Sequence, residues 1–209
     1  MHRKLLLFDF DGVIFDSFDA MAPLVTKHWG TTEEEQRAVH DANVFTAKDE
    51  ETPEERDAEE ARIAAFYAEA DRVLPDMCPV FPGVRAVLPQ LAVNYRLFVV
   101  SSSLSSTITK VLEQCSLADC FSGIYGMENE RSKVKKIHTI LAAAGKHPRE
   151  SLFITDTLGD VREARTAGVD AIAVTWGFHD RERVLQGEPW DTCDDPADLP
   201  EKIGRYFAG

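Results

Sequence analysis

Two carboxylates two positions apart, Asp9 and Asp11, directly follow the apolar run 5–8 and precede Gly12. An uninterrupted apolar run is typical of a strand buried on both faces of a parallel sheet. Ligands of open α/β sheets bind beyond the carboxyl ends of such strands, where these two acids stand. Paired acids there indicate a divalent-cation site, a carboxylate nucleophile, or both. The alternative is a strand that ends in a polar turn, because Asp and Gly are common turn residues.

A serine cluster, Ser101, Ser102 and Ser103, follows a second apolar run at 96–100 and precedes a predicted helix over 105–115. The free N–H groups and the dipole at a helix N-terminus favour bound anions. The cluster therefore predicts a cradle for an oxyanion or a phosphate. The simpler alternative is an ordinary serine-rich N-cap.

Two further acids and one lysine complete the set of candidate residues. Asp156 directly follows a third apolar run, 152–155, and Asp160 either belongs to the same site or caps the helix that follows. Lys133 stands in the first turn of a predicted helix that ends at Gly145, where a cation opposes the helix dipole. A bound anion near Lys133 would remove that conflict, and an ordinary solvated lysine is the alternative.

The elements that must position these residues alternate along the chain. Apolar segments that predict strands lie at 5–8, 96–100, 124–126, 152–155 and 171–174. Segments with helical apolar spacing lie between most of them. This order predicts an α/β fold, in which a Rossmann-like, mostly parallel sheet carries helices on both faces. The carboxyl ends of the strands then gather the candidate residues at one edge of the sheet.

The segment 16–78 has a different character, because it contains helical spacing and almost no strand-like run. Helices are predicted at 17–29, 32–44 and 53–73, with Ser17 as a plausible N-cap of the first. Residues 16 to 76 include 17 acidic and 6 basic side chains, so this segment carries most of the net charge of −13. We therefore predict a helical domain over 16–78, inserted into a core domain formed by 1–15 and 79–209.

Bulk properties exclude several classes of protein. The net charge of −13 and the lack of Lys and Arg clusters argue against nucleic acid as a partner. No apolar run approaches the roughly 20 residues that span a bilayer, and the run at 5–8 is too short for a signal peptide. The cysteines lack CxxC spacing, which favours reduced, structural thiols at Cys78, Cys115, Cys120 and Cys193. A cytoplasmic enzyme is expected, of unknown oligomeric state.

Four segments in this order, DFDGV, VVSSS, SK before a helix, and ITDTLGD, resemble the four motifs of the haloacid-dehalogenase superfamily. Together they span nearly the whole chain outside the insert, and their order is more specific than any single motif. The resemblance implies that Asp9 is the nucleophile and that Asp11 is the general acid and base. Ser101 would bind the transferring phosphoryl group beside Ser102, while Lys133 would balance its charge.

The resemblance also implies a Mg²⁺ site. Asp9, the main-chain carbonyl of Asp11 and Asp156 would hold the ion, and Asp160 would support that site from close by. The dehalogenase branch of the superfamily lacks an Asp at the place of Asp11, and the phosphonatase branch usually has Ala there. A small-molecule phosphate ester is therefore the implied substrate.

The insert corresponds in place and helical character to the cap domain of this superfamily, which closes over the site and selects the leaving group. The segments FPGVRAVLPQL and VTWGFHDRE further resemble the phosphoglycolate-phosphatase-like branch. Two positions depart from the motifs: Ser102 stands where many relatives have Asn, and Thr155 stands where Gly is frequent. Neither departure removes a required charge.

The resemblance thus implies a Mg²⁺-dependent phosphatase that hydrolyses a phosphoglycolate-like or sugar phosphate monoester through an aspartyl-phosphate. A phosphomutase on a sugar phosphate is the first alternative, and a non-catalytic regulatory module with the same fold is the second. The acidic cap is ill suited to a second phosphate unless basic residues face the cleft, and the candidates are Lys27, His28, Arg37 and Lys48.

Overall fold

The computed structural model of the protein describes residues 3–45, 52–77 and 79–209, and within them the chain forms a six-stranded sheet. The strands are β1 (Leu5–Phe8), β2 (Arg96–Val100), β3 (Phe121–Tyr125), β4 (Ser151–Thr155), β5 (Asp170–Val174) and β6 (Asp191–Cys193). All pairs are parallel, in the order β3-β2-β1-β4-β5-β6, so the predicted Rossmann-like α/β fold is confirmed. The sequence did not predict β6, because its three residues are too few to show a pattern.

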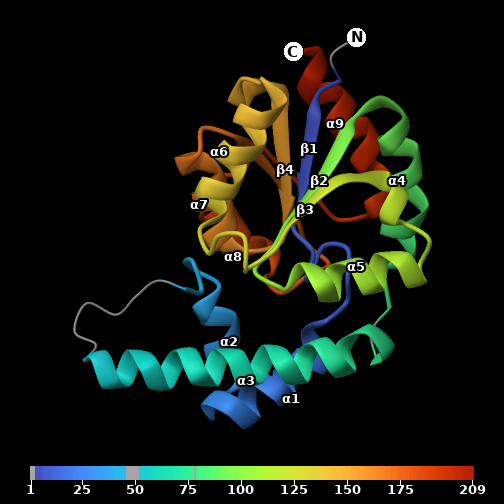
Figure 1. The fold of residues 1–209 in the computed structure, drawn as a ribbon. Coiled ribbons are helices and arrows are strands. Elements are labelled where there is room, and N and C mark those ends of the chain that lie inside the picture. The colour runs from blue at the N-terminus through green and yellow to red at the C-terminus, as the bar shows by residue number, and fades with distance from the viewer. Residues whose placement is uncertain (1–2, 46–51, 78) are drawn as a thin grey trace.

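Helices cover both faces of the sheet (Figure 1). One layer holds α4 (Pro82–Asn94), α5 (Ser105–Gln114) and α9 (Leu199–Ala208). The other layer holds α6 (Lys133–Ala144), α7 (Leu158–Thr166) and α8 (Arg181–Leu185). Leu6 and Phe8 of β1 belong to the first apolar core, and Leu5 and Leu7 belong to the second. This division explains why β1 reads as a continuous apolar run rather than an alternating one.

A separate group of helices lies beyond the carboxyl ends of the strands (Figure 1). It consists of α1 (Phe18–Trp29), α2 (Glu33–Val39) and α3 (Pro53–Met77). The helix predicted at 32–44 ends earlier, at Val39, because the next residue turns to the core, where the His40 carbonyl accepts a bond from Gly159 N. Lys48, named above as a candidate cap contact, lies outside the described residues.

The two connections between this helical insert and the sheet run side by side. Phe15 and Val80 form an antiparallel bridge, and the Asp16 amide donates to the Pro79 carbonyl at 3.0 Å. The chain therefore leaves and re-enters the core at one place, next to the predicted boundaries. The division into a core domain and a cap domain stays a prediction.

Cys115, Cys120 and Cys193 are free thiols, while Cys78 lies outside the described residues. Burial raises the pKa of the Cys193 thiol to about 11, so this group is neutral at pH 7. Over residues 3–45, 52–77 and 79–209, every helix is too short or too polar to cross a membrane. The cytoplasmic location stays a prediction.

Candidate active site

Lys133 joins two buried carboxylates at the carboxyl edge of the sheet. Its Nζ lies 2.7 Å from Asp9 Oδ2 and 2.6 Å from Asp160 Oδ2. Asp9 directly follows β1, Lys133 opens α6, and Asp160 lies in the first turn of α7. The parallel sheet thus brings together Asp9 and Lys133, which are 124 positions apart in the chain.

Burial and charge act in opposite directions on these three groups. Burial raises the pKa of the Asp9 carboxyl well above its usual value, and the charge of Lys133 opposes this rise. Burial would also raise the pKa of Asp160, but the charge of Lys133 and the hydrogen bonds to Asp160 lower it to about 2. Burial acts to lower the pKa of Lys133, and the charges of Asp160 and Asp9 outweigh it and raise the pKa.

A lysine such as Lys133 in the first turn of a helix opposes the helix dipole and needs nearby negative charge. The carboxylates of Asp9 and Asp160 provide that charge. The alternative of a solvated lysine is wrong, because this residue is only 4% exposed. The alternative in which Asp160 caps α7 is also wrong. The N-cap is Thr157, whose hydroxyl accepts from the Asp160 amide, and Asp160 Oδ2 accepts from Lys133 and from Thr155 Oγ1.

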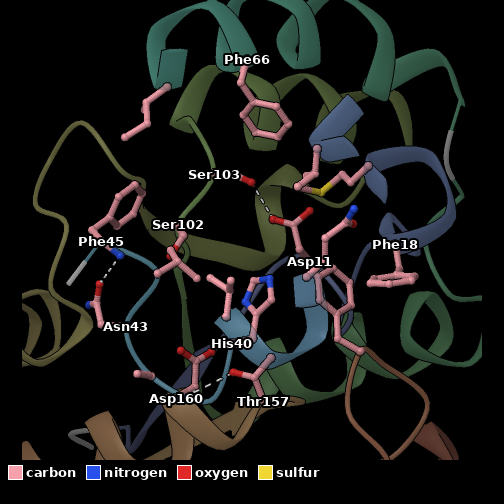
Figure 2. Close-up of a pocket in the computed structure, with 18 of the residues that line it drawn as sticks. Asp11, Phe18, His40, Asn43, Phe45, Phe66, Ser102, Ser103, Thr157 and Asp160 are labelled. Carbon is pink, nitrogen blue, oxygen red and sulfur yellow. Dashed lines mark hydrogen bonds between the residues drawn. The ribbon is translucent and has the colours of Figure 1, made fainter. Parts of the chain in front are cut away.

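Two hydroxyl groups hold the carboxylate of Asp11. Ser17 Oγ donates to Asp11 Oδ1 at 2.8 Å. Ser103 Oγ donates to Asp11 Oδ2 at 2.6 Å (Figure 2). Burial raises the pKa of Asp11, while these two hydrogen bonds lower it in part. The sequence missed this role of Ser17, whose side chain makes no capping bond to α1. The only feature of the sequence that could have indicated this role is a hydroxyl side chain a few positions after the paired acids.

The serine cluster is not an ordinary N-cap, because the residue that caps α5 is Leu104 and makes no side-chain bond there. Ser101 is fully buried, and its Oγ accepts a bond from the Ser103 amide at 3.0 Å. Lys136 is buried beside it and donates from Nζ to the Ser101 carbonyl at 2.6 Å. Burial lowers the pKa of Lys136 to about 8. Sequence reasoning missed Lys136, which looks like one more helix-surface lysine.

Asp156 is fully buried at the end of β4, and its two carboxylate oxygens have different surroundings. The Phe178 amide donates to Oδ2 at 2.7 Å, whereas Oδ1 has no hydrogen-bond partner. Burial raises the pKa of this carboxyl to about 7. Gly12 and Gly177 approach the carboxylate so closely that a Cβ on either would lie 2.0 Å or 2.3 Å from Oδ2.

This close approach predicts that Gly12→Ala destabilises the protein more than Gly30→Ala. Both glycines have φ +73°, but an added Cβ at Gly30 meets nothing within 4 Å. The Gly30 variant therefore shows only backbone strain, about 1 kcal/mol. The Gly12 variant adds a clash with Asp156 and Phe178, at a further cost of about 2 kcal/mol. Urea unfolding curves measure the free energy of unfolding of both variants. Equal losses of that free energy would contradict the prediction.

The donors at this edge fit a hard divalent cation. A buried carboxylate oxygen without a partner, such as Asp156 Oδ1, is costly, and a bound ion would satisfy it. Among the residues that the structure describes, no three Asp, Glu, His or Cys side chains form a metal-binding group. The ligand set predicted from the sequence, which combines the carboxylates of Asp9 and Asp156 with the main-chain oxygen of Asp11, stays a prediction.

A cavity of about 390 Å³ lies between the helical insert and this edge of the sheet. Figure 2 shows Phe66 reaching from α3 toward Asp11 and Ser103 of the core. The candidate site residues that line the cavity are Asp9, Asp11, Ser102, Lys133 and Asp160. Ser101 and Asp156 are fully buried near its floor and are not among the lining side chains.

Polar contacts hold the insert against the core around the cavity. Tyr67 on α3 donates from its hydroxyl to the Ser102 carbonyl at 2.5 Å. Asp41, just after α2, accepts two hydrogen bonds from the Arg183 guanidinium, at 2.7 and 2.8 Å. These contacts hold the insert over the cavity that the carboxylates line.

Comparison with known proteins gives matches along most of the chain. A family model described as haloacid dehalogenase-like hydrolase matches residues 6–174. The phosphoglycolate phosphatase of Synechococcus elongatus is 26% identical over 211 residues, which cover 98% of this chain and 99% of that protein. The phosphoglycolate phosphatase of Yersinia pseudotuberculosis is 30% identical over 129 residues, which cover 60% of this chain and 56% of that protein.

Solved structures show the same fold at low sequence identity. A structure described as a predicted phosphatase from Clostridium acetobutylicum is 19% identical, with a TM-score of 0.81 over 98% of this chain and 100% of that one. A haloacid dehalogenase-like family hydrolase from Streptococcus pneumoniae is 21% identical, with a TM-score of 0.74 over 97% of this chain and 99% of that one.

Proposed function

Because the chain belongs to the haloacid dehalogenase-like hydrolase family and is a phosphatase of that family, we propose that it hydrolyses a small phosphate monoester through an aspartyl-phosphate on Asp9, with Mg²⁺ as its cofactor. The observation that carries this proposal is the buried contact of Lys133 with Asp9 and Asp160 at the wall of a partly enclosed cavity. A carboxylate that ends a central strand and has an ammonium group beside it suits attack on a phosphoryl group.

In the first step, a carboxylate oxygen of Asp9 attacks phosphorus, and the bond from phosphorus to the alcohol oxygen breaks. Asp11 donates a proton to the departing alkoxide. Lys133 offsets the negative charge that Asp9 and the phosphoryl oxygens bring together. Mg²⁺, when held by Asp9, Asp156 and the Asp11 carbonyl, supplies further positive charge to those oxygens.

In the second step, water attacks the aspartyl-phosphate, and Asp11 takes up the proton of that water. The products are inorganic phosphate and the regenerated Asp9 carboxylate. Ser17 and Ser103 keep the Asp11 carboxyl in one orientation during both steps. Ser101 and Ser102 are the proposed binding residues for the phosphoryl group, with Ser102 lining the cavity.

Release of inorganic phosphate tests this function. The purified protein is expected to release phosphate from a panel of phosphate monoesters with Mg²⁺ present, and to lose at least about 99% of that activity with a chelator. Added Mg²⁺ should restore the rate. The panel includes phosphoglycolate, which the names of the relatives suggest, and sugar phosphates.

Two results would contradict the proposal. An isomeric sugar phosphate formed without free phosphate would favour a phosphomutase. No turnover of any ester by a folded protein with Mg²⁺ present would favour a non-catalytic module.

A further inference from the structure

Among the described residues that line the cavity, none offers a free cation to a substrate beyond its phosphate end. Lys133 is the only Lys or Arg of that described lining, and Asp9 and Asp160 already hold its ammonium group. His40 also lines the cavity, but burial lowers its pKa to about 4, so the imidazole is neutral at pH 7. A carboxylate or a second phosphate on the substrate therefore finds no positive partner among these described side chains.

Three basic residues in the described part of the insert make other contacts. The Arg37 guanidinium lies 3.7 Å from the centre of the Phe18 ring and donates to the Phe178 carbonyl. Lys27 Nζ and His28 Nε2 lie 2.7 Å and 3.0 Å from Glu69 oxygens. None of these three side chains lines the cavity. A second anionic group on the substrate would need basic residues that face the cleft. Arg37, Lys27 and His28 do not supply them.

Two acids of the cavity wall act against an anionic substrate. Glu59 on α3 accepts a hydrogen bond from Trp29 Nε1 at 2.8 Å. Glu163 accepts one from the Lys133 amide at 3.0 Å. Negative charges in a partly enclosed cavity repel a second anion, and the surrounding apolar walls screen that repulsion poorly.

The insert contributes a mostly apolar wall to the cavity. Its apolar side chains include Phe18, Met21, Val25, Trp29, Ile63 and Phe66, and its polar ones include Thr31, Gln36 and Glu59. The Trp29 and Phe66 rings pack edge to face with centroids 5.1 Å apart, so this wall has a fixed shape. Gln36 Nε2 and Glu59 Oε1 are already engaged in hydrogen bonds within the insert. Sugar hydroxyl groups therefore find few partners on this wall, whereas apolar groups gain from leaving water.

We propose that the enzyme selects phosphate monoesters of an uncharged, apolar alcohol over phosphoglycolate and sugar phosphates. This inference rests on the phosphatase function proposed above for the same site. Each methylene group buried on the apolar wall raises affinity roughly fourfold. An apolar ring in the leaving group therefore raises affinity much more than the carboxylate of phosphoglycolate does.

Four esters test the selectivity: benzyl phosphate, cyclohexylmethyl phosphate, glucose 6-phosphate and phosphoglycolate. Each loses a primary alcohol, so differences in rate report mainly on the fit of the leaving group. With Mg²⁺, kcat/KM for the first two is expected to exceed that for the last two at least tenfold. If phosphoglycolate or glucose 6-phosphate matches them, this inference is overturned and the phosphatase function stands. If no ester releases phosphate, both fail.

Ile63→Lys tests the cause of the selectivity. Ile63 is half-buried on α3, so a lysine there reaches the cavity without filling the core. The ratio of kcat/KM for benzyl phosphate to that for phosphoglycolate should fall at least tenfold. Ile63→Met controls for size, and Val93→Lys, on the exposed surface of α4, controls for charge. A folded Ile63→Lys enzyme with an unchanged ratio overturns the inference.

Discussion

Asp9→Asn is expected to abolish turnover, with a fall in kcat of at least about 10⁴-fold, while the protein stays folded. An amide lacks the anionic oxygen that attacks phosphorus. The fold survives because an Asn oxygen can still accept the 2.7 Å hydrogen bond from the Phe10 amide, and Lys133 keeps its contact with Asp160. Phosphate release measures the rate, and circular dichroism confirms the fold.

Asp11→Asn is the matched control, because it makes the same chemical change two positions along the chain and leaves the nucleophile intact. With p-nitrophenyl phosphate, whose leaving group needs no proton from Asp11, this variant should form the aspartyl-phosphate and hydrolyse it slowly, so phosphorylated protein accumulates and is detected by intact-protein mass. The Asp9 variant should show no such species. An Asp9→Asn protein that turns over at the wild-type rate would rule out the proposed route.

Lys133→Met is expected to lower the free energy of unfolding by about 3 kcal/mol or more at pH 7. The ammonium group is the partner of two buried carboxylates, and its loss leaves both without a counter-charge. The same change should lower kcat, because charge on the phosphoryl oxygens is no longer offset. Urea unfolding at fixed pH measures the loss of stability.

The effect of Lys133→Met on stability should depend on pH. In the wild type, the pKa of Asp160 lies at about 2, below its ordinary 3.8, so this group stabilises the fold above pH 4 and loses that effect as pH falls toward 2. Without Lys133, burial raises the pKa of Asp9 and Asp160 above the ordinary value. Each carboxyl then destabilises the fold as pH rises, and the gap to wild type is larger at pH 7 than at pH 4.

Lys136→Met is the control on the same helix. Lys136 is equally buried, but its Nζ donates to the neutral carbonyl oxygen of Ser101. Its loss should cost about 1 kcal/mol. The cost should not change between pH 4 and pH 7, because a pKa of about 8 keeps this group charged throughout. Equal pH dependence in the two variants would contradict the role given to Lys133.

The sequence alone determines the class of fold and the edge of the sheet at which chemistry takes place. The run 5–8 is apolar at every position, which requires burial on both faces, and that requirement holds only in a sheet covered by helices on both sides. Asp9 and Asp156 each directly follow such a strand. A parallel sheet then places them at the same edge whatever the details of packing.

Only the tertiary structure decided which side chains touch. The sequence places Lys133 and Asp9 124 positions apart, and nothing local shows that one ammonium group serves both Asp9 and Asp160. The contact of Ser17 with Asp11 and the burial of Lys136 also arise from packing between distant segments. The mostly apolar lining of the cavity also depends on long-range packing. That packing determines which faces of α1 and α3 turn toward the core. A helix of mixed sequence presents its apolar face wherever burial is most favourable, and local spacing cannot specify that partner.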